Sequence, residues 1–494
     1  MITSQEYRKR LYAMRPNIHI GGDYVGRDDQ RLEQPTNVVA ATFDMAQDPQ
    51  YDGLATATSH LTGDKINRFC HIHQSVDDLL LKQKMTRLEC HKVGGCIQRC
   101  MGIDVMNALS IVTYETDQKY GTEYNKRFMK FLANFQNNDL VANCAQTDVK
   151  GDRSKRPHEQ ADPDLYLRIV ERKSDGIVVS GAKAHNTIAP YAEEIIAVPT
   201  RFLTEEESDW AVAFAVPGDW EGVHQIVRVA NIRPREHLKA PIANFGDAES
   251  LTVFDNVFVP WERVFLCGER DMGGRLALLF ALYHRHSYTG CKPSITDIIM
   301  GTTALAAEYN GVEKAQHIRI KLAHLIGIAE LVYAAGIAAA MHSEISASGT
   351  YIPETNYCNV GRRLAGENIH YEHEILCDVA GGIYATLPYE QDWLNDETKG
   401  YLEKYIMRNP NVSAEDQHRC FRMISDLLAS GWAGVELAAQ FHGGGSPIME
   451  TIGLLTNYDL EAKKDIAKYL AGINKELDHS KLLKEELRAD ERRL

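Results

Sequence analysis

The feature that most constrains the fold is a run of strand signals between two long helical stretches. Across residues 165–259, short segments rich in β-branched and aromatic residues alternate with turn signals, and Ser174-Asp175-Gly176 predicts a hairpin. The flanking sequence follows helical periodicity instead. We therefore expect a multidomain α+β protein with an N-terminal helical domain at 1–142, a central antiparallel β domain at 143–271, and a C-terminal helical bundle with a helical tail at 272–494.

Two long segments of the C-terminal stretch carry specific expectations. Residues 302–343 are rich in alanine and predict helix, with a break at Asn310-Gly311. Residues 414–440 predict one continuous helix, because helical periodicity persists until the glycines and proline of residues 442–447 stop it.

Charge and hydropathy exclude several classes of protein. The net charge of −14 argues against nucleic-acid partners, since binding to nucleic acid depends on a basic surface. The longest uncharged apolar run, at 331–342, is too short to cross a bilayer, and the N-terminus shows no signal-peptide pattern. Ten cysteines in such a chain indicate reduced thiols in the cytoplasm, where clustering favours metal or redox chemistry over disulfides.

Two groups of residues have the spacing of metal ligands. His284 and Cys291 lie seven residues apart, which is about two helical turns, so both side chains point the same way on a helix. Cys96 and Cys100 lie four residues apart, which predicts a second pair on one helical face. Three thiols and one imidazole suit either a structural zinc ion or an iron–sulfur cluster. The same spacing also occurs among ordinary buried cysteines.

Several motifs make the sequence resemble the 4-hydroxyphenylacetate 3-hydroxylase family of flavoproteins. They lie at 96–104 (CIQRCMGID), 147–153 (TDVKGDR), 181–187 (GAKAHNT), 253–260 (VFDNVFVP), 283–292 (YHRHSYTGCK) and 442–447 (HGGGSP). The hydroxylases of this family have the flavin but not the cysteines. The combination of Cys96 and Cys100 with His284 and Cys291 therefore resembles the branch that dehydrates acyl-CoA substrates. This resemblance implies an acyl-CoA dehydrogenase-like plan, with flavin between the β domain and the bundle, and a homotetramer.

The implied cofactors are FAD and a [4Fe–4S] cluster held by Cys96, Cys100, Cys291 and His284. The implied reaction is the radical dehydration of 4-hydroxybutyryl-CoA to crotonyl-CoA, with vinylacetyl-CoA isomerisation as a related activity. The flavin would carry one electron away from the substrate and return it, while the histidine-bound iron polarises the leaving hydroxyl. The alternatives are a flavin-dependent aromatic hydroxylase without iron, an isomerase of a different acyl-CoA, and a non-catalytic protein with structural zinc.

The resemblance also implies roles for individual residues. Those expected at the flavin are Thr147, Asp148, Lys150, Asp152, Arg153, Thr187, Gly381 and Gly382. Those expected at the substrate are His284, Tyr288, Glu249 and Lys292. Glu249 is the carboxylate expected to handle protons. The family has a second glutamate that we place three residues before the histidine of the 442–447 motif, where this chain has Ala439; Glu436 and Glu450 are the candidates to replace it.

Overall fold

Two β-sheets contain most of the strands of the molecule. The computed structural model describes residues 1–473 and 476–477. The larger sheet has six strands in the order β2-β1-β10-β11-β7-β6, and the smaller has four in the order β12-β9-β8-β5. The strands are β1 (Ile18–Ile20), β2 (Asp23–Val25), β5 (Ala142–Ala145), β6 (Arg168–Arg172), β7 (Gly176–Thr187), β8 (Glu194–Ala197), β9 (Val212–Pro217), β10 (Val223–Asn231), β11 (Gly246–Pro260) and β12 (Val264–Cys267).

The pairing of these strands is mostly, but not wholly, antiparallel. The expected hairpin joins β6 to β7. The expectation of a purely antiparallel region is wrong, because β1 pairs parallel with β10 and β5 pairs parallel with β8. Both parallel pairs join segments that are distant in the sequence, so local turn signals carried no information about them. Strands β1 and β2 come from the stretch that was expected to be helical.

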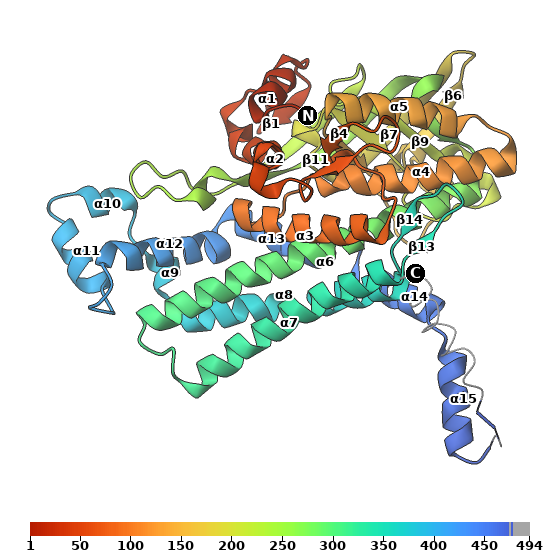
Figure 1. Cartoon of the computed structure of the whole chain (residues 1–494). Coiled ribbons are helices and arrows are strands. Elements are labelled where there is room, and N and C mark those ends of the chain that lie inside the picture. Colours follow the sequence, from red (N-terminus) through yellow and green to blue (C-terminus); the bar gives the residue numbers. More distant parts are fainter. Residues whose placement is uncertain (474–475, 478–494) are drawn as a thin grey trace.

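The helices pack around these sheets and form a long bundle (Figure 1). In the N-terminal stretch they are α1 (Ser4–Ala13), α2 (Glu33–Gln47), α3 (Val76–Val93), α4 (Cys100–Tyr120) and α5 (Tyr124–Asn138), with the short strands β3 (Thr56–Thr58) and β4 (Lys65–Asn67) between α2 and α3. Helices α4 and α5 pack against the four-stranded sheet through an apolar core that includes Leu109, Phe131 and Phe265. The first part of the chain thus joins helices and strands in one core.

The C-terminal stretch is almost entirely helical. Its elements are α6 (Arg270–Tyr309), α7 (Gln316–Met341), β13 (Glu344–Ile345), β14 (Tyr351–Ile352), α8 (Thr355–Ala380), α9 (Ile383–Thr386), α10 (Glu390–Leu394), α11 (Lys399–Ile406), α12 (Ala414–Ala429), α13 (Gly431–His442), α14 (Pro447–Asn457) and α15 (Leu460–Leu470). Helix α15 projects away from the body (Figure 1). Beyond it, most of the expected helical tail lies outside the described residues.

Two expectations about helix ends have different outcomes. The break at Asn310-Gly311 is confirmed, because α6 ends at Tyr309 and Gly311 has φ +70°. The single helix expected over residues 414–440 is wrong. Ser430 is extended (φ −107°, ψ 165°), and its hydroxyl accepts a hydrogen bond from the backbone N–H of Ala433. A serine in that position caps a new helix, so the segment forms α12 and α13.

Helix α7 lies in the bundle with a largely apolar sequence. By length and composition it is the one helix of the described chain that could also cross a bilayer. In this structure it packs against α3, α6 and α8 and places Ile318, Leu325 and Val332 in the interior. One face of α7 therefore packs inside the bundle, and the other face is exposed.

Helices α3, α6 and α7 pack closely against one another. The close contact requires a glycine, Gly290, because a larger residue there would meet the neighbouring backbone. A Cβ atom added to Gly290 of α6 would lie 2.5 Å from the carbonyl oxygen of Gln83 on α3. The Gln83 side-chain amide donates hydrogen bonds to the carbonyl oxygens of Thr289 on α6 and Tyr333 on α7. One residue of α3 thus ties together the helices that carry the candidate site.

We expect Gly290→Ala to destabilise the protein by about 1–3 kcal/mol, because the added methyl group overpacks the α3–α6 contact. The matched control is Gly301→Ala on the same helix, where an added Cβ meets no atom within 4 Å. The control should instead stabilise the helix by roughly 0.5–1 kcal/mol through its higher helix propensity. Melting temperatures measured by calorimetry would test this, and equal values for the two variants would contradict the proposed close approach.

Candidate active site and metal centre

The predicted metal ligands meet where the α3–α4 connection faces α6. A Cys100 sulfur, an Asp104 carboxylate oxygen and a His284 ring nitrogen all lie within 4.8 Å of one another. Hydrogen bonds with Cys100 and Cys291 hold the pKa of the Cys96 thiol well below its ordinary value. The structure therefore brings the three predicted thiols and the imidazole together at one site.

The backbone that places Cys96 is a loop, so the expectation of one helical face for Cys96 and Cys100 is wrong. Gly94 ends α3 in the left-handed conformation with φ +76°. Gln98 also has a left-handed φ of +61°, and α4 begins only at Cys100. Adjacent glycines at 94 and 95 are a helix-stop signal that the four-residue spacing of the cysteines obscured.

A fourth thiol, that of Cys90, reaches the same site, and it lies outside the motifs that carry the family resemblance. Cys90 lies in the last turn of α3 and packs in one buried cluster with Cys100 and Cys291. Burial raises the pKa of the Cys90 thiol, while a hydrogen bond with Cys291 acts in the opposite direction. No local signal in the sequence placed Cys90 here, because its contact with Cys291 joins α3 to α6.

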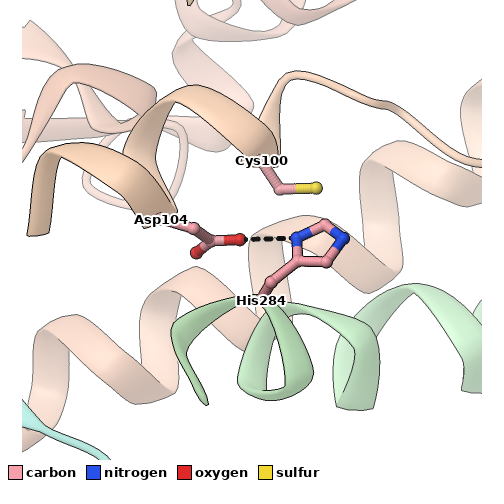
Figure 2. Close-up of side chains that lie close together, drawn as sticks. All are labelled: Cys100, Asp104 and His284. Carbon is pink, nitrogen blue, oxygen red and sulfur yellow. Dashed lines mark hydrogen bonds and ion pairs between the residues drawn. The ribbon is translucent and has the colours of Figure 1, made fainter. Parts of the chain in front are cut away.

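The imidazole of His284 is held by a buried carboxylate. Asp104 Oδ2 lies 2.9 Å from His284 Nδ1, and Figure 2 shows the other ring nitrogen directed away from Asp104. Asp104 Oδ1 accepts hydrogen bonds from Lys82 Nζ at 3.0 Å and Ser287 Oγ at 2.8 Å. Burial opposes ionisation, but the Lys82 charge and the His284 hydrogen bond outweigh it and lower the pKa of Asp104.

Three further carboxyl groups gather near Cys96. Glu436 Oε1 accepts a hydrogen bond from the Cys96 backbone N–H at 3.0 Å, and Glu249 Oε1 accepts one from the Thr187 hydroxyl at 2.7 Å. Burial raises the pKa of Glu436 and of Glu249 to about 7 in each case. Burial and the neighbouring Glu249 also raise the pKa of Asp247. Carboxyl groups with a pKa near neutrality are suited to proton transfer.

The geometry separates the two glutamates considered in place of Ala439. Glu436 lies one turn before Ala439 on α13 and contacts the backbone of a predicted metal ligand. Glu450 is buried elsewhere, with Oε1 3.9 Å from Nε of Arg362. Glu436 is therefore the better-placed glutamate.

Tyr288 and Lys292, both expected at the substrate, are engaged by internal partners. The Tyr288 hydroxyl donates a hydrogen bond to the Gln440 carbonyl oxygen at 2.5 Å. Lys292 Nζ lies 2.5 Å from Glu372 Oε2, and both side chains are fully buried. These contacts tie α6 to α13 and to α8.

Two arginines hold the glycine-rich segment that follows α13. Arg285 Nε donates a hydrogen bond to the Gly444 carbonyl oxygen at 2.9 Å. Arg362 donates to the carbonyl oxygens of Gly443 at 2.5 Å and Phe441 at 2.6 Å. Side chains of α6 and α8 thereby fix the end of α13, the helix that carries the glutamate contacting the cysteine loop.

The loop expected at the flavin is pinned to β7. The Thr147 carbonyl oxygen accepts a hydrogen bond from the Ala184 N–H at 2.8 Å. Asp148 forms a buried ion pair with Lys183 at 2.8 Å. The side chains of Asp152 and Arg153 are exposed. The loop therefore has a fixed base against β7, the strand that ends at Thr187, and a solvent-facing tip.

Basic groups surround the tip of this loop. Burial, followed by the charges of Arg153 and Arg201, lowers the pKa of Lys150. Burial, followed by the charges of Lys150 and His442, lowers the pKa of His185. Within the described chain, Lys150, Arg153 and Arg201 have no acidic side chain at ion-pair distance. A cluster of unneutralised cations of this kind suits an anionic group such as a diphosphate.

The glycine pair at the end of α8 has a clear local role. Gly381 adopts φ +68° and donates its N–H to the Cys377 carbonyl oxygen, so it terminates the helix. Gly381 and Gly382 are both exposed. Their contact with a flavin of a neighbouring subunit stays a prediction.

Comparison with known proteins assigns the family. Models of the N-terminal and C-terminal parts of 4-hydroxyphenylacetate 3-hydroxylase match residues 3–266 and 274–472. The chain belongs to the 4-hydroxyphenylacetate 3-hydroxylase family. The family resemblance carried by the sequence motifs is thereby confirmed.

Within this family the chain is similar to dehydratases and, more distantly, to hydroxylases. It is 39% identical, over 96% of its length and 100% of the relative's, to the 4-hydroxybutyryl-CoA dehydratase/vinylacetyl-CoA-Δ-isomerase of Clostridium aminobutyricum. The solved structure of an oxygen-tolerant archaeal 4-hydroxybutyryl-CoA dehydratase from N. maritimus superposes with a TM-score of 0.91 at 37% identity, covering 96% of both chains. An oxygenase component of 4-hydroxyphenylacetate 3-monooxygenase, complexed with FAD and 4-hydroxyphenylacetate, gives 0.85 at 24% identity and shares the fold, covering 95% of this chain and 98% of its own.

We expect Gly95→Ala to push α13 away from the cysteine loop, because the added Cβ would lie 2.6 Å from both Glu436 Oε1 and the Trp432 ring. Hydrogen–deuterium exchange of the amides of α13 should accelerate. The matched control is Gly434→Ala on α13, where an added Cβ meets no atom within 4 Å. Unchanged protection of α13 in Gly95→Ala would show that this contact does not hold the helix.

Proposed function

We propose that this enzyme dehydrates 4-hydroxybutyryl-CoA to crotonyl-CoA and isomerises vinylacetyl-CoA, with FAD and a [4Fe–4S] cluster as cofactors. The observation that carries the proposal is the convergence of Cys96, Cys100, Cys291 and His284 at one partly buried site. The similarity to two dehydratases over nearly the whole chain supports the same assignment.

The residues at the metal centre fit an iron–sulfur cluster. Thiolates are the usual ligands of such clusters, and an imidazole can replace one of them. His284 presents one ring nitrogen to Asp104 and leaves the other for a metal ion (Figure 2). When bound, the cluster would supply a Lewis acid that polarises the leaving hydroxyl. The protein side of this chemistry is to hold the imidazole and the thiols in fixed positions.

The residues around the 147–153 loop fit FAD. The unneutralised side chains of Lys150, Arg153 and Arg201 suit its diphosphate, and the Thr187 hydroxyl lies at the end of β7, where a flavin ring would meet the carboxyl of Glu249. The bound flavin would supply one-electron chemistry. We place it between the β domain at 143–271 and the bundle at 272–494, as in the acyl-CoA dehydrogenase-like plan, with the helical domain at 1–142 beside it.

The chain's own groups would bind and move protons. Glu249 and Glu436, each with a pKa raised to about 7, can accept and return protons at the α and β carbons of an acyl-CoA. Thr187 orients Glu249 through its hydroxyl. Tyr288 and Lys292 act by holding α6 against α13 and α8, because both polar groups are already paired.

A homotetramer is part of this proposal. Helix α7 exposes Ile320, Ile326 and Leu331 to solvent, and α14 exposes Ile448 and Leu455. Apolar surface of this extent suits contacts with further copies of the chain. The expected location is the cytoplasm, where the thiols of the site stay reduced.

The test is an anaerobic assay of the purified protein with 4-hydroxybutyryl-CoA, alongside iron and flavin analysis. The proposal expects crotonyl-CoA as product, bound flavin, and about four irons per chain, the content of a cubane cluster. The alternative, an aromatic hydroxylase, expects flavin without iron and hydroxylation of a phenol when reduced flavin is supplied. Finding that second pattern would refute the dehydratase.

We expect Cys291→Ser to lose most of the bound iron, because it removes one thiolate from the proposed ligand set. The matched control is Cys90→Ser. Cys90 belongs to the same buried cluster as Cys291, but it is not one of the proposed ligands. Cys90→Ser should retain wild-type iron content in colorimetric iron analysis. Loss of iron in Cys90→Ser with retention in Cys291→Ser would exchange the two residues in the ligand set.

We expect Glu249→Gln to lower kcat for 4-hydroxybutyryl-CoA by about 10²–10⁴-fold, because an amide cannot take up or return a proton. Iron and flavin content should not change. The control is Glu262→Gln, which changes an exposed glutamate between β11 and β12. This variant should keep the wild-type kcat. Wild-type turnover in Glu249→Gln would remove Glu249 from the proton-transfer role.

A further inference from the structure

We propose that Asp104 is a positioning residue that fixes the orientation and tautomer of His284, and that Lys82 and Ser287 hold Asp104 for this purpose. The inference rests on the proposed function, since it assumes that His284 binds the metal cluster. It extends that function by assigning work to three residues that touch neither substrate nor cofactor.

The contacts form a chain that crosses three helices. Lys82 from α3 and Ser287 from α6 both donate hydrogen bonds to Asp104 Oδ1. Asp104 from α4 meets His284 Nδ1 through its other oxygen. An ion-paired carboxylate only accepts hydrogen bonds, so Nδ1 carries the proton and the opposite nitrogen, Nε2, keeps its lone pair. Metal-binding histidines are commonly oriented by a carboxylate in this way.

Asp104 itself is a poor candidate for a ligand, although it lies among ligand-type side chains. Both of its oxygens are engaged by three donors, and the side chain is completely buried. Binding a metal ion directly would cost contacts with Lys82 and Ser287. In Figure 2 the carboxylate faces one ring nitrogen of His284, and the other ring nitrogen points away from it.

Stability alone gives no reason for this buried pair. Lys82 and Asp104 are both 0% exposed, and removing two charges from water offsets most of their attraction. An apolar pair of similar volume would hold α3 and α4 together at least as well. The directional contact with His284 is what an apolar pair cannot supply. The ring is further confined by Phe280, which stacks on it at a centroid distance of 5.6 Å.

The test compares Asp104→Asn with wild type in the iron-loaded protein. The amide keeps the shape but lacks the charge, so we expect iron to be lost to a ferrous chelator about 10–100-fold faster. Mössbauer spectra of ⁵⁷Fe-labelled protein should also show a changed signal for the histidine-bound iron. Flavin content should remain at the wild-type value, which separates a positioning role from general loss of structure.

Two further variants keep the test decisive. Ser287→Ala removes only one hydrogen bond to Asp104 and should accelerate iron loss by about fivefold even where Asp104→Asn fails to fold. Asp426→Asn breaks a buried ion pair with Arg235 outside the site, and it should leave the rate of iron loss unchanged.

The outcomes separate the inference from the proposed function. Wild-type protein that holds no iron refutes both. Iron-loaded wild type, with Asp104→Asn and Ser287→Ala showing wild-type iron release and Mössbauer spectra, refutes the positioning role alone. Equal acceleration in Asp426→Asn would also refute it, because the effect would then follow from lost stability.

Discussion

The structure of the site depends on the hydrogen bonds and the ion pair that surround one buried carboxylate, that of Asp104. Asp104 has no access to water, so its charge is tolerable only when Lys82, Ser287 and His284 all reach it. Those partners lie on α3 and α6, and Asp104 lies on α4. The helices that form the core are therefore locked in register by the same contacts that orient the imidazole. The contacts that stabilise the fold are therefore also the contacts that would shape the proposed metal site.

The other half of the site comes from the far end of the sequence. Helix α13 returns to the cysteine loop, where Glu436 accepts the N–H of Cys96. The end of that helix is fixed by Tyr288, Arg285 and Arg362, which bind four successive or nearly successive carbonyl oxygens. Tyr288, which the family resemblance places at the substrate, thus links α6 to α13, and its role at the substrate stays a prediction.

The sequence predicted the arrangement of site residues correctly where both residues of a spacing pattern lie on one helix. His284 and Cys291 share α6, so their seven-residue spacing predicted their common direction correctly. It was insufficient where backbone conformation intervened, because left-handed Gly94 and Gln98 turn the approach to Cys100 into a loop. The contacts of Glu436 and Cys90 depend on which helices meet, and a local pattern contains no such information.

The acidic groups of the site fall into two classes with different environments. Asp104 is surrounded by donors and a cation, which keep it ionised and fixed. Glu249 and Glu436 are buried with few donors, which raises the pKa of each to about 7 and leaves their protons exchangeable. Asp104 therefore carries a fixed charge beside His284, whereas Glu249 and Glu436 can exchange a proton near neutral pH. That division is what a site needs if metal binding and proton transfer are to proceed a few ångströms apart without disturbing each other.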